Sequence, residues 1–298
     1  MQSVCIGVNN CAEEVIDHIK NELKNMKAEK VNYSVTKNEK LISIVYSIED
    51  EIYFSPKPVN LFNKMKICIS NALADYIIRQ YEERIIKKII NSYYCYFNNI
   101  EKKEIFRLVY DIIKNDELFS DNLLKFNRKN IIFQKLVDYF QASDSIILDG
   151  FINFRLKEYM KILGTIVDRA VDEFLVEKEY QEFIKLLKYF VEIQEPKYII
   201  VHVIFENISD SYILYDHSGN DITNECVKEY LSDIIDEEIN KDDLLVSSLI
   251  SFAPRRIIMH MGGVVENKEI VDTIQSIFSG KIIICNGCEF CLADNIIK

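Results

Sequence analysis

The spacing of apolar side chains changes twice along this sequence, and that change constrains the fold more than any other feature. Apolar residues recur at every second position in 4–8, 31–35 and 42–48, with a helical stretch starting at residue 12. From 62 to 194 they recur at every third or fourth position. Strands repeat a face every two residues and helices about every 3.6, so the first part is predicted to be β, α, β, β and the middle helical.

The C-terminal part mixes strands and helices. Strands are expected at 198–205, 212–215, 256–261 and 282–284, and helices at 227–235, 244–250 and 270–277. The fold class is therefore predicted to be α+β, or mixed α/β: a helical middle flanked by an N-terminal βαββ section and a C-terminal βαβ section. One arrangement that this order allows is a single sheet shared by both ends, which would bring the termini together.

Prolines mark the limits of the helical middle. Pro56 and Pro58 precede it, and Pro196 ends it because the ring disfavours a helical conformation at the residue before it. We therefore expect three parts, an N-terminal βαββ section at 1–55, a helical region at 56–196, and an α/β section with the cysteine cluster at 197–298.

Charge and composition exclude several classes of protein. The formal net charge of −11 would repel a phosphate backbone, so nucleic acid is not expected as a partner. No apolar run is long enough to span a membrane, and Glu13, Glu14 and Asp17 interrupt any secretory signal. Without an export signal, eight cysteines are expected to be reduced thiols, and the protein is expected to be cytoplasmic.

Three of those cysteines form the densest candidate chemistry. Cys285, Cys288 and Cys291 directly follow the predicted strand at 282–284, in a C-x-x-C-x-x-C spacing that can aim thiolates at one ion. Zinc or an iron–sulfur cluster would take a fourth ligand. The candidates for that ligand are Cys5, Cys11, Cys226 and His260. A redox-active thiol pair and a tight turn of small residues are the two alternatives that the pattern leaves open.

The segment around His260 is the second candidate region. Arg255 and Arg256 precede a predicted strand, and Gly262 and Gly263 follow it, where backbone amides can approach a phosphate. However, neither a dinucleotide fingerprint nor a P-loop motif is present, so an ordinary turn is the alternative. His260 itself is a candidate metal ligand, catalytic base or core histidine. Hydrolase signatures are also absent, and we nominate no catalytic residue.

Several strings in the second half resemble the YtxC family of bacterial sporulation proteins. They are Asp149 to Tyr159 (DGFINFRLKEY), Glu177 to Phe183 (EKEYQEF), Tyr189 to Glu192 followed by Gln194 to Pro196, Ala253 to Ile257 with His260, and the closing C-x-x-C-x-x-C. The resemblance implies a role in endospore formation in Firmicutes. It implies no established reaction, cofactor or catalytic residue.

Two functional hypotheses follow. The first is a cytoplasmic, sporulation-associated, non-enzymatic protein that acts through an unidentified protein partner, with the cysteines as a structural metal knuckle or a tight turn. The second is a metal- or thiol-dependent enzyme or sensor in which Cys285, Cys288, Cys291 and His260 form the site. The spatial arrangement of those four residues discriminates between them.

Overall fold

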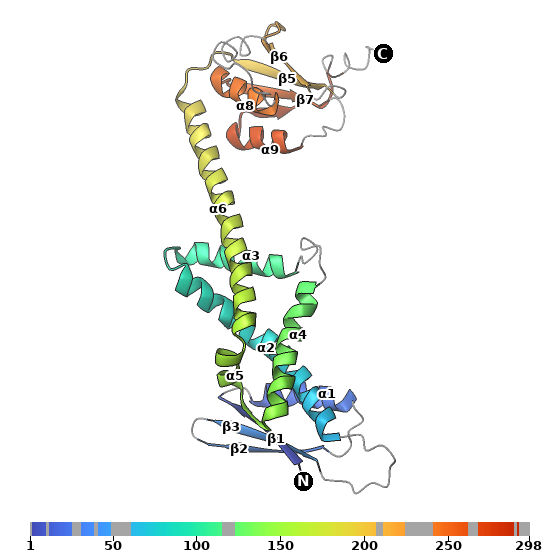
Figure 1. The fold of residues 1–298 in the computed structure, drawn as a ribbon. Helices are drawn as coiled ribbons and strands as arrows, with labels where there is room; N and C mark the ends of the chain where they lie inside the picture. Colours follow the sequence, from blue (N-terminus) through green and yellow to red (C-terminus); the bar gives the residue numbers. More distant parts are fainter. Residues whose placement is uncertain are drawn as a thin grey trace, which may run out of the picture. The chain divides into compact units, whose positions relative to one another are not determined.

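The computed structural model describes residues 2–9, 12–25, 31–38, 41–48, 61–114, 123–206, 211–223, 241–261, 268–288 and 291. The chain divides into two compact units, Met1–Leu175 and Val176–Lys298, and each has its own hydrophobic core (Figure 1). The α+β fold class predicted from the sequence is confirmed. The three-part division into 1–55, 56–196 and 197–298 stays a prediction, and the two units are described separately below.

The first unit contains a four-stranded mixed sheet. Its elements are β1 (Gln2–Val8), α1 (Ala12–Asn25), β2 (Val31–Lys37), β3 (Ile42–Ile48) and β4 (Ser145–Ile147), with the strands in the order β2-β3-β1-β4. β1 runs antiparallel to β3 and parallel to β4, and the register pairs Val4 with Tyr46 and Ile6 with Ile44. These side chains share one buried face, which confirms the βαββ order and its period of two.

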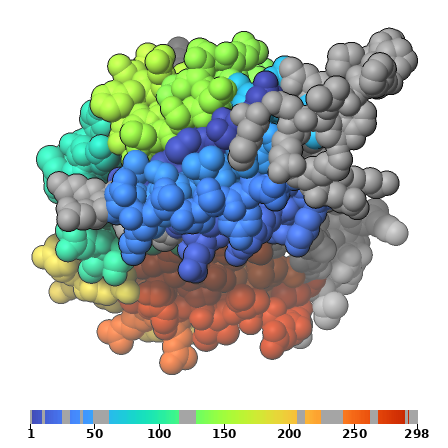
Figure 2. Space-filling model, turned by 90° about the horizontal axis from the view of Figure 1, so that it is seen from below, coloured from blue at the N-terminus to red at the C-terminus, as the bar shows by residue number. Residues whose placement is uncertain are grey.

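Strand β2 forms an exposed edge of this sheet. Along β2 the side chains after Val31 are all exposed, and Figure 2 shows the blue strands from outside. The short strand β4 was not expected from the sequence. Its three residues are too few to establish a period of two, and it forms by pairing with β1.

In the middle of the chain the described residues form five helices. They are α2 (Leu61–Tyr93), α3 (Asn99–Lys114), α4 (Leu123–Ala142), α5 (Leu148–Arg155) and α6 (Lys157–Ile193). The helix α2 is continuous over its whole length. The helix α6 runs through Gly164, and α5 and α6 are separated at Leu156. A helical glycine costs only about 1 kcal/mol relative to alanine, which burial of the neighbouring stripe offsets.

A buried ionic network connects three of these helices. Arg128 on α4 donates through Nη1 to both carboxylate oxygens of Glu82 on α2, at 3.1 and 3.2 Å. The hydroxyl of Tyr159 on α6 also donates to Glu82. Burial, together with the nearby Glu82 carboxylate, raises the pKa of Tyr159, so this hydroxyl keeps its proton. All three side chains are buried, and the pairing offsets the cost of removing the charges from water.

The second unit has its own mixed sheet. Its elements are β5 (Ile200–Glu206), β6 (Ser211–Asp216), α8 (Lys241–Phe252), β7 (Arg256–His260), α9 (Lys268–Ile277) and β8 (Ile282–Ile284), with the strands in the order β6-β5-β7-β8. β5, β7 and β8 are parallel, and β6 pairs antiparallel with β5. The expected β-α-β order of β7, α9 and β8 is therefore confirmed. The helix expected at 227–235 lies outside the described residues.

The two ends of the chain do not share a sheet. Both ends form separate four-stranded sheets, so the shared arrangement considered from the sequence is wrong. Each sheet has its own covering helices, and Figure 1 shows α8 and α9 on one side of the C-terminal sheet. Among the described residues, no helix combines the length and the apolar character needed to cross a membrane.

Candidate metal centre

The candidate centre lies at the carboxyl ends of β7 and β8. His260 is the last residue of β7, and Cys285 follows the last residue of β8. The backbone N–H of Cys285 donates to the carbonyl oxygen of Met259 at 2.9 Å, which extends the pairing of the two strands by one residue. Parallel pairing therefore brings the histidine and the first cysteine to the same edge of the sheet, although 25 positions of sequence separate them.

Three thiols and one imidazole nitrogen converge at this edge. The Nδ1 atom of His260 lies 3.3 Å from Cys288 Sγ and 3.4 Å from Cys291 Sγ. Cys291 Sγ lies 3.9 Å from Cys288 Sγ and 3.7 Å from Cys285 Sγ. All four atoms are within 4.8 Å of one another. His260 is 2% exposed and the cysteines are half-buried, so the cluster is open to solvent on the cysteine side.

These distances fit the ligand shell of a single tetrahedral ion. With Zn–S bonds of about 2.3 Å and a Zn–N bond of about 2.0–2.1 Å, tetrahedral angles place two sulfurs about 3.8 Å apart and sulfur and nitrogen about 3.5 Å apart. In a 4Fe–4S cluster each thiolate binds a different iron, and the sulfurs are held farther apart than they are here. The sulfurs are also too far apart for a disulfide, and all three cysteines are free.

Backbone groups hold the cysteine segment in a tight turn. The N–H of Gly287 donates to Cys285 Sγ at 3.5 Å, and the N–H of Cys291 donates to the carbonyl oxygen of Cys288 at 3.0 Å. Gly287 has φ +128°, which residues with a Cβ rarely adopt. A tight turn and a set of metal ligands are therefore compatible interpretations of this segment, because the turn brings the thiols together.

The surroundings of Cys291 disfavour its thiolate. Burial raises the pKa of Cys291, and the neighbouring thiols of Cys285 and Cys288 raise it further, although a backbone hydrogen bond from Cys288 to the Cys291 thiol acts in the opposite direction. Since the thiolate is the nucleophile in disulfide exchange, a raised pKa disfavours a reactive thiol pair.

His202 contacts His260 on the side away from the cysteines. It was not nominated from the sequence. Its Nδ1 lies 2.9 Å from Nε2 of His260, and the two rings stack with centroids 5.2 Å apart. His202 is on β5, and the parallel register that pairs Ile204 with His260 puts the two histidines diagonally across neighbouring strands. A histidine inside each of two predicted strands was the available signal, but the strand order was needed to use it.

The arrangement of the two rings selects which nitrogen of His260 faces the thiols. Burial lowers the pKa of both histidines, and the charge interaction between them lowers that of His260 further, so both rings are neutral near pH 7. A neutral His260 that donates from Nε2–H to His202 presents the Nδ1 lone pair to the cysteines. This is the tautomer that a metal ligand requires.

The other residues nominated from the sequence do not join this group. Cys5 lies on β1 in the first unit, and Cys11 and Cys226 lie outside the described residues. Gly262 and Gly263 are outside them as well, so the phosphate-binding interpretation of that loop stays a prediction. Within the part of the chain that the structure describes, His260 is the nominated fourth ligand that reaches the three cysteines.

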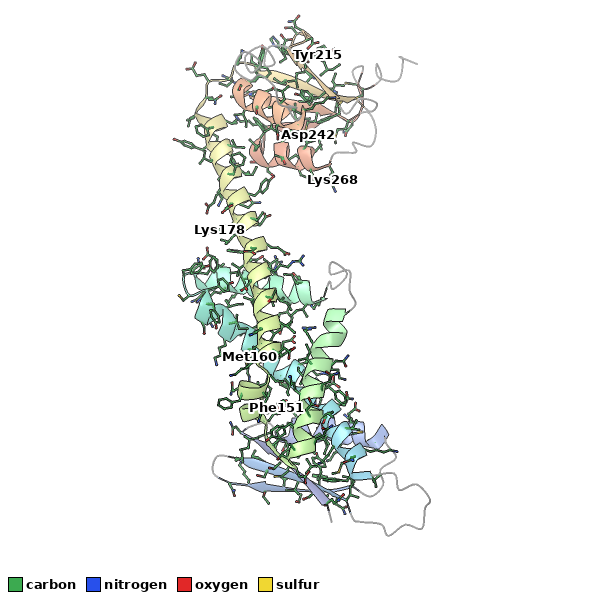
Figure 3. All side chains as sticks on the ribbon, viewed as in Figure 1. Phe151, Met160, Lys178, Tyr215, Asp242 and Lys268 are labelled. Carbon is green, nitrogen blue, oxygen red and sulfur yellow. The ribbon has the colours of Figure 1, made fainter. Side chains whose placement is uncertain are left out.

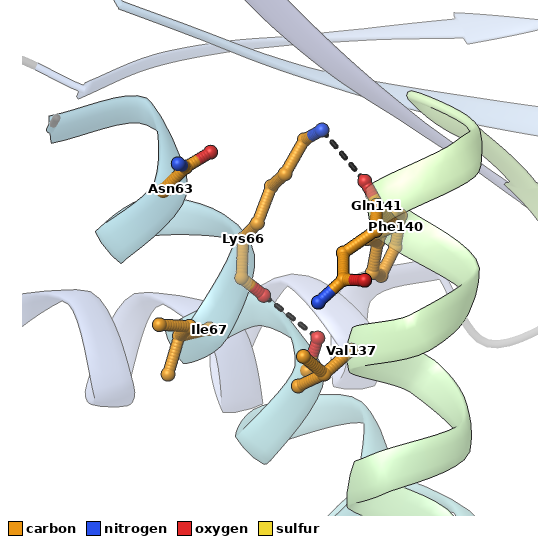
Figure 4. A pocket seen from close by; sticks show the side chains of 7 residues that line it. Asn63, Lys66, Ile67, Val137, Phe140 and Gln141 are labelled. Atoms are coloured by element: carbon orange, nitrogen blue, oxygen red, sulfur yellow. Dashed lines mark hydrogen bonds between the residues drawn. The ribbon is translucent and has the colours of Figure 1, made fainter.

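A pocket in the first unit offers less chemistry. It has a volume of about 340 Å³ and lies between α2 and α4, where Lys66 is its one charged lining residue (Figure 4). The Lys66 ammonium donates to the carbonyl oxygen of Phe140 at 2.7 Å and pairs with Asp144 at 2.5 Å. The ammonium group is thus satisfied by contacts with α4 and with Asp144 just beyond it. The Ser70 hydroxyl, which also lines the pocket, donates to the carbonyl oxygen of Lys66 at 2.8 Å.

The fold and the site define the class of this protein as an α+β protein with a candidate Cys3His metal centre at a sheet edge. The model of the YtxC-like family matches residues 67–283, more than half of the chain, so the chain belongs to the YtxC-like family. The resemblance seen in the sequence is confirmed. The match ends just before Cys285, so the cysteines lie beyond it.

One relative is the uncharacterized protein YtxC of Bacillus subtilis (strain 168). It is 26% identical to this chain over 216 residues, which cover 70% of this chain and 73% of that protein. No solved structure matches the chain.

Proposed function

We propose that the protein binds one zinc ion through Cys285, Cys288, Cys291 and His260, and that it acts in sporulation as a non-enzymatic protein. The observation that carries the metal proposal is the convergence of four ligand atoms within 4.8 Å of one another. Thiolates and imidazole in tetrahedral array suit zinc better than magnesium or calcium, which prefer oxygen ligands.

The number of ligands favours a structural role over catalysis. Catalytic zinc sites keep a position open for water or substrate, whereas structural sites fill all four positions with protein groups. Here the protein supplies four groups. The ion would tie the segment after β8 to the end of β7 and would add its binding free energy to the stability of the second unit.

The cellular setting rests on other observations. Membership of the YtxC-like family, together with the strings quoted above, supports a place in spore formation, and the uncharacterized relative adds no reaction. The six described cysteines are free thiols, as is usual in the reducing cytoplasm. The protein is accordingly proposed to be cytoplasmic and to work by contact with other proteins.

Metal analysis of three chains tests the site. The wild type, Cys288→Ser and Cys95→Ser are purified anaerobically, and zinc and iron per chain are measured. Cys95 is exposed and lies on the first unit, so its variant controls for loss of a thiol. About one zinc is expected in the wild type and in Cys95→Ser, and much less in Cys288→Ser. Near-zero metal in all three, or several irons per wild-type chain, would contradict a mononuclear zinc site.

The same variants connect the site to sporulation. A deletion strain is complemented with the wild type, Cys95→Ser or Cys288→Ser, and heat-resistant spores are counted. If the zinc site supports the function, Cys288→Ser yields fewer such spores and Cys95→Ser yields wild-type numbers. Full rescue by a metal-free Cys288→Ser chain would separate the metal from the sporulation role.

A further inference from the structure

A groove of about 500 Å³ lies on the second unit between α6, α8 and α9. Its floor is apolar and includes Tyr180, Phe183 and Leu187 from α6 with Val246 and Ile250 from α8. The hydroxyl of Tyr180 lies 3.3 Å from Thr273 Oγ1, which joins the wall formed by α6 to the wall formed by α9. The groove belongs to elements other than those that carry the cysteines.

The apolar surface here exceeds what burial in the core explains. Ile184 and Val191 bury one side of α6 in the core of this unit. Phe183 and Tyr180, which both line the groove, are nevertheless 57% and 40% exposed. A helix that is apolar beyond its buried stripe is typical of a helix that packs against a further partner.

Among the residues that the structure describes, the charged ones that line the groove are all acidic. Asp242 and Asp243 are in the first turn of α8, and Glu269 is in the first turn of α9; Figure 3 labels Asp242 and also Lys268, which neighbours Glu269 but does not line the groove. Carboxylates in a first turn stabilise their helices through the helix dipole. Placed around an apolar floor, they also give the groove a negative rim, on a chain whose net charge is −11.

We infer that this groove binds an amphipathic helix of a partner protein, with apolar side chains toward the floor and Lys or Arg toward the rim. Apolar residues at i, i+3 or i+4, and i+7 reach a groove of this kind, and basic residues beside them pair with the three carboxylates. A second copy of this acidic chain is disfavoured, since it would bring like charge to the rim. This inference rests on the proposed action through protein contacts and specifies the chemistry of the partner. It does not depend on zinc binding.

Two designed peptides test the groove on the full chain. Both have about 15 residues, enough for a helix, with leucine at the groove-facing positions. One has lysines beside the leucines and the other has glutamates there. Binding is measured by fluorescence anisotropy, with zinc per chain recorded for every sample. The lysine peptide is expected to bind the wild type at least about tenfold more tightly than the glutamate peptide.

Variants separate the floor from the rim. Phe183→Ser should weaken binding of the lysine peptide by about tenfold or more, since exposed aromatic anchors dominate such contacts. Tyr189→Ser, at an equally exposed position on α6 that does not line the groove, should leave binding unchanged. The double variant Asp243→Lys with Glu269→Lys should prefer the glutamate peptide.

These binding measurements test the groove independently of the zinc proposal. Absence of binding by either peptide, equal binding of both, or equal loss in Phe183→Ser and Tyr189→Ser would overturn the inference about the groove. So would a concentration-dependent dimer in sedimentation that Phe183→Ser abolishes, because a second copy would then occupy the groove. A chain that lacks zinc and still binds the lysine peptide with the expected preference would overturn the zinc proposal alone.

Discussion

At the scale of single residues, the chemistry of the candidate centre depends on a pair of histidines. His260 faces the cysteines with Nδ1 and His202 with Nε2, so one ring is positioned by the other. Ligating histidines usually have such a partner for the second nitrogen, and the partner fixes both tautomer and ring orientation. His202 is therefore a positioning residue for the proposed zinc ligand.

Replacement of His202 should weaken zinc binding without removing a ligand. In His202→Ala, the Nε2–H of His260 loses its acceptor, and zinc affinity is expected to fall about 10–100-fold in competition with a chromogenic chelator. His202→Asn, which keeps an acceptor, should recover part of that loss. His217→Ala, in an exposed turn, should bind zinc like the wild type. Unchanged affinity in His202→Ala would show that the ring pair is packing alone.

The same residues show what sequence can predict about a site. Cys285, Cys288 and Cys291 could be nominated because local spacing alone brings their thiols together. His260 was one of four candidates for the fourth ligand, since nothing local relates it to the cysteines. His202 was not nominated. Its position beside His260 follows from the pairing of β5 with β7, and no residue near it in the sequence indicates that pairing.

At the scale of helices and strands, periodicity predicted most elements and failed where an element is set by its neighbours. The long runs of apolar residues at helical spacing in α2 and α6 and the alternation in β1 and β3 are strong local signals. The strand β4 exists through its pairing with β1, and the interruption at Leu156 has no glycine or proline to mark it. Whether two groups of strands share a sheet depends on long-range packing, so the separation into two sheets could not be predicted.

The buried network between α2, α4 and α6 gives a prediction at this scale. In Arg128→Met the carboxylate of Glu82 stays buried without its cation, and the free energy of unfolding is expected to fall by about 3–5 kcal/mol. Urea unfolding followed by circular dichroism measures the change. Arg107→Met, which removes an exposed pair with Glu104, should change stability by less than about 1 kcal/mol.

The double variant distinguishes a lost attraction from an uncompensated charge. Adding Glu82→Gln to Arg128→Met removes the buried carboxylate, and part of the lost stability should return because no unpaired charge is left. A double variant less stable than Arg128→Met would show that Glu82 stabilises the helices mainly through Tyr159, which donates to the same carboxylate.

At the scale of the whole molecule, the chain has two hydrophobic cores. One core belongs to Met1–Leu175 and the other to Val176–Lys298, and each is built on its own sheet. The buried ionic network lies in the first unit and the candidate metal centre in the second. A perturbation of either feature should therefore act on one core.

Calorimetry of the full chain should then show two unfolding transitions that respond to different changes. Zinc at about 100 times its dissociation constant stabilises the unit that binds it by about 2.7 kcal/mol, so removal of zinc by a chelator should lower one midpoint by several degrees. Arg128→Met should lower the other midpoint, and Cys288→Ser should reproduce the effect of the chelator. A single transition that both changes displace would mean that the two cores unfold together, because independent cores cannot transmit a loss of stability to each other.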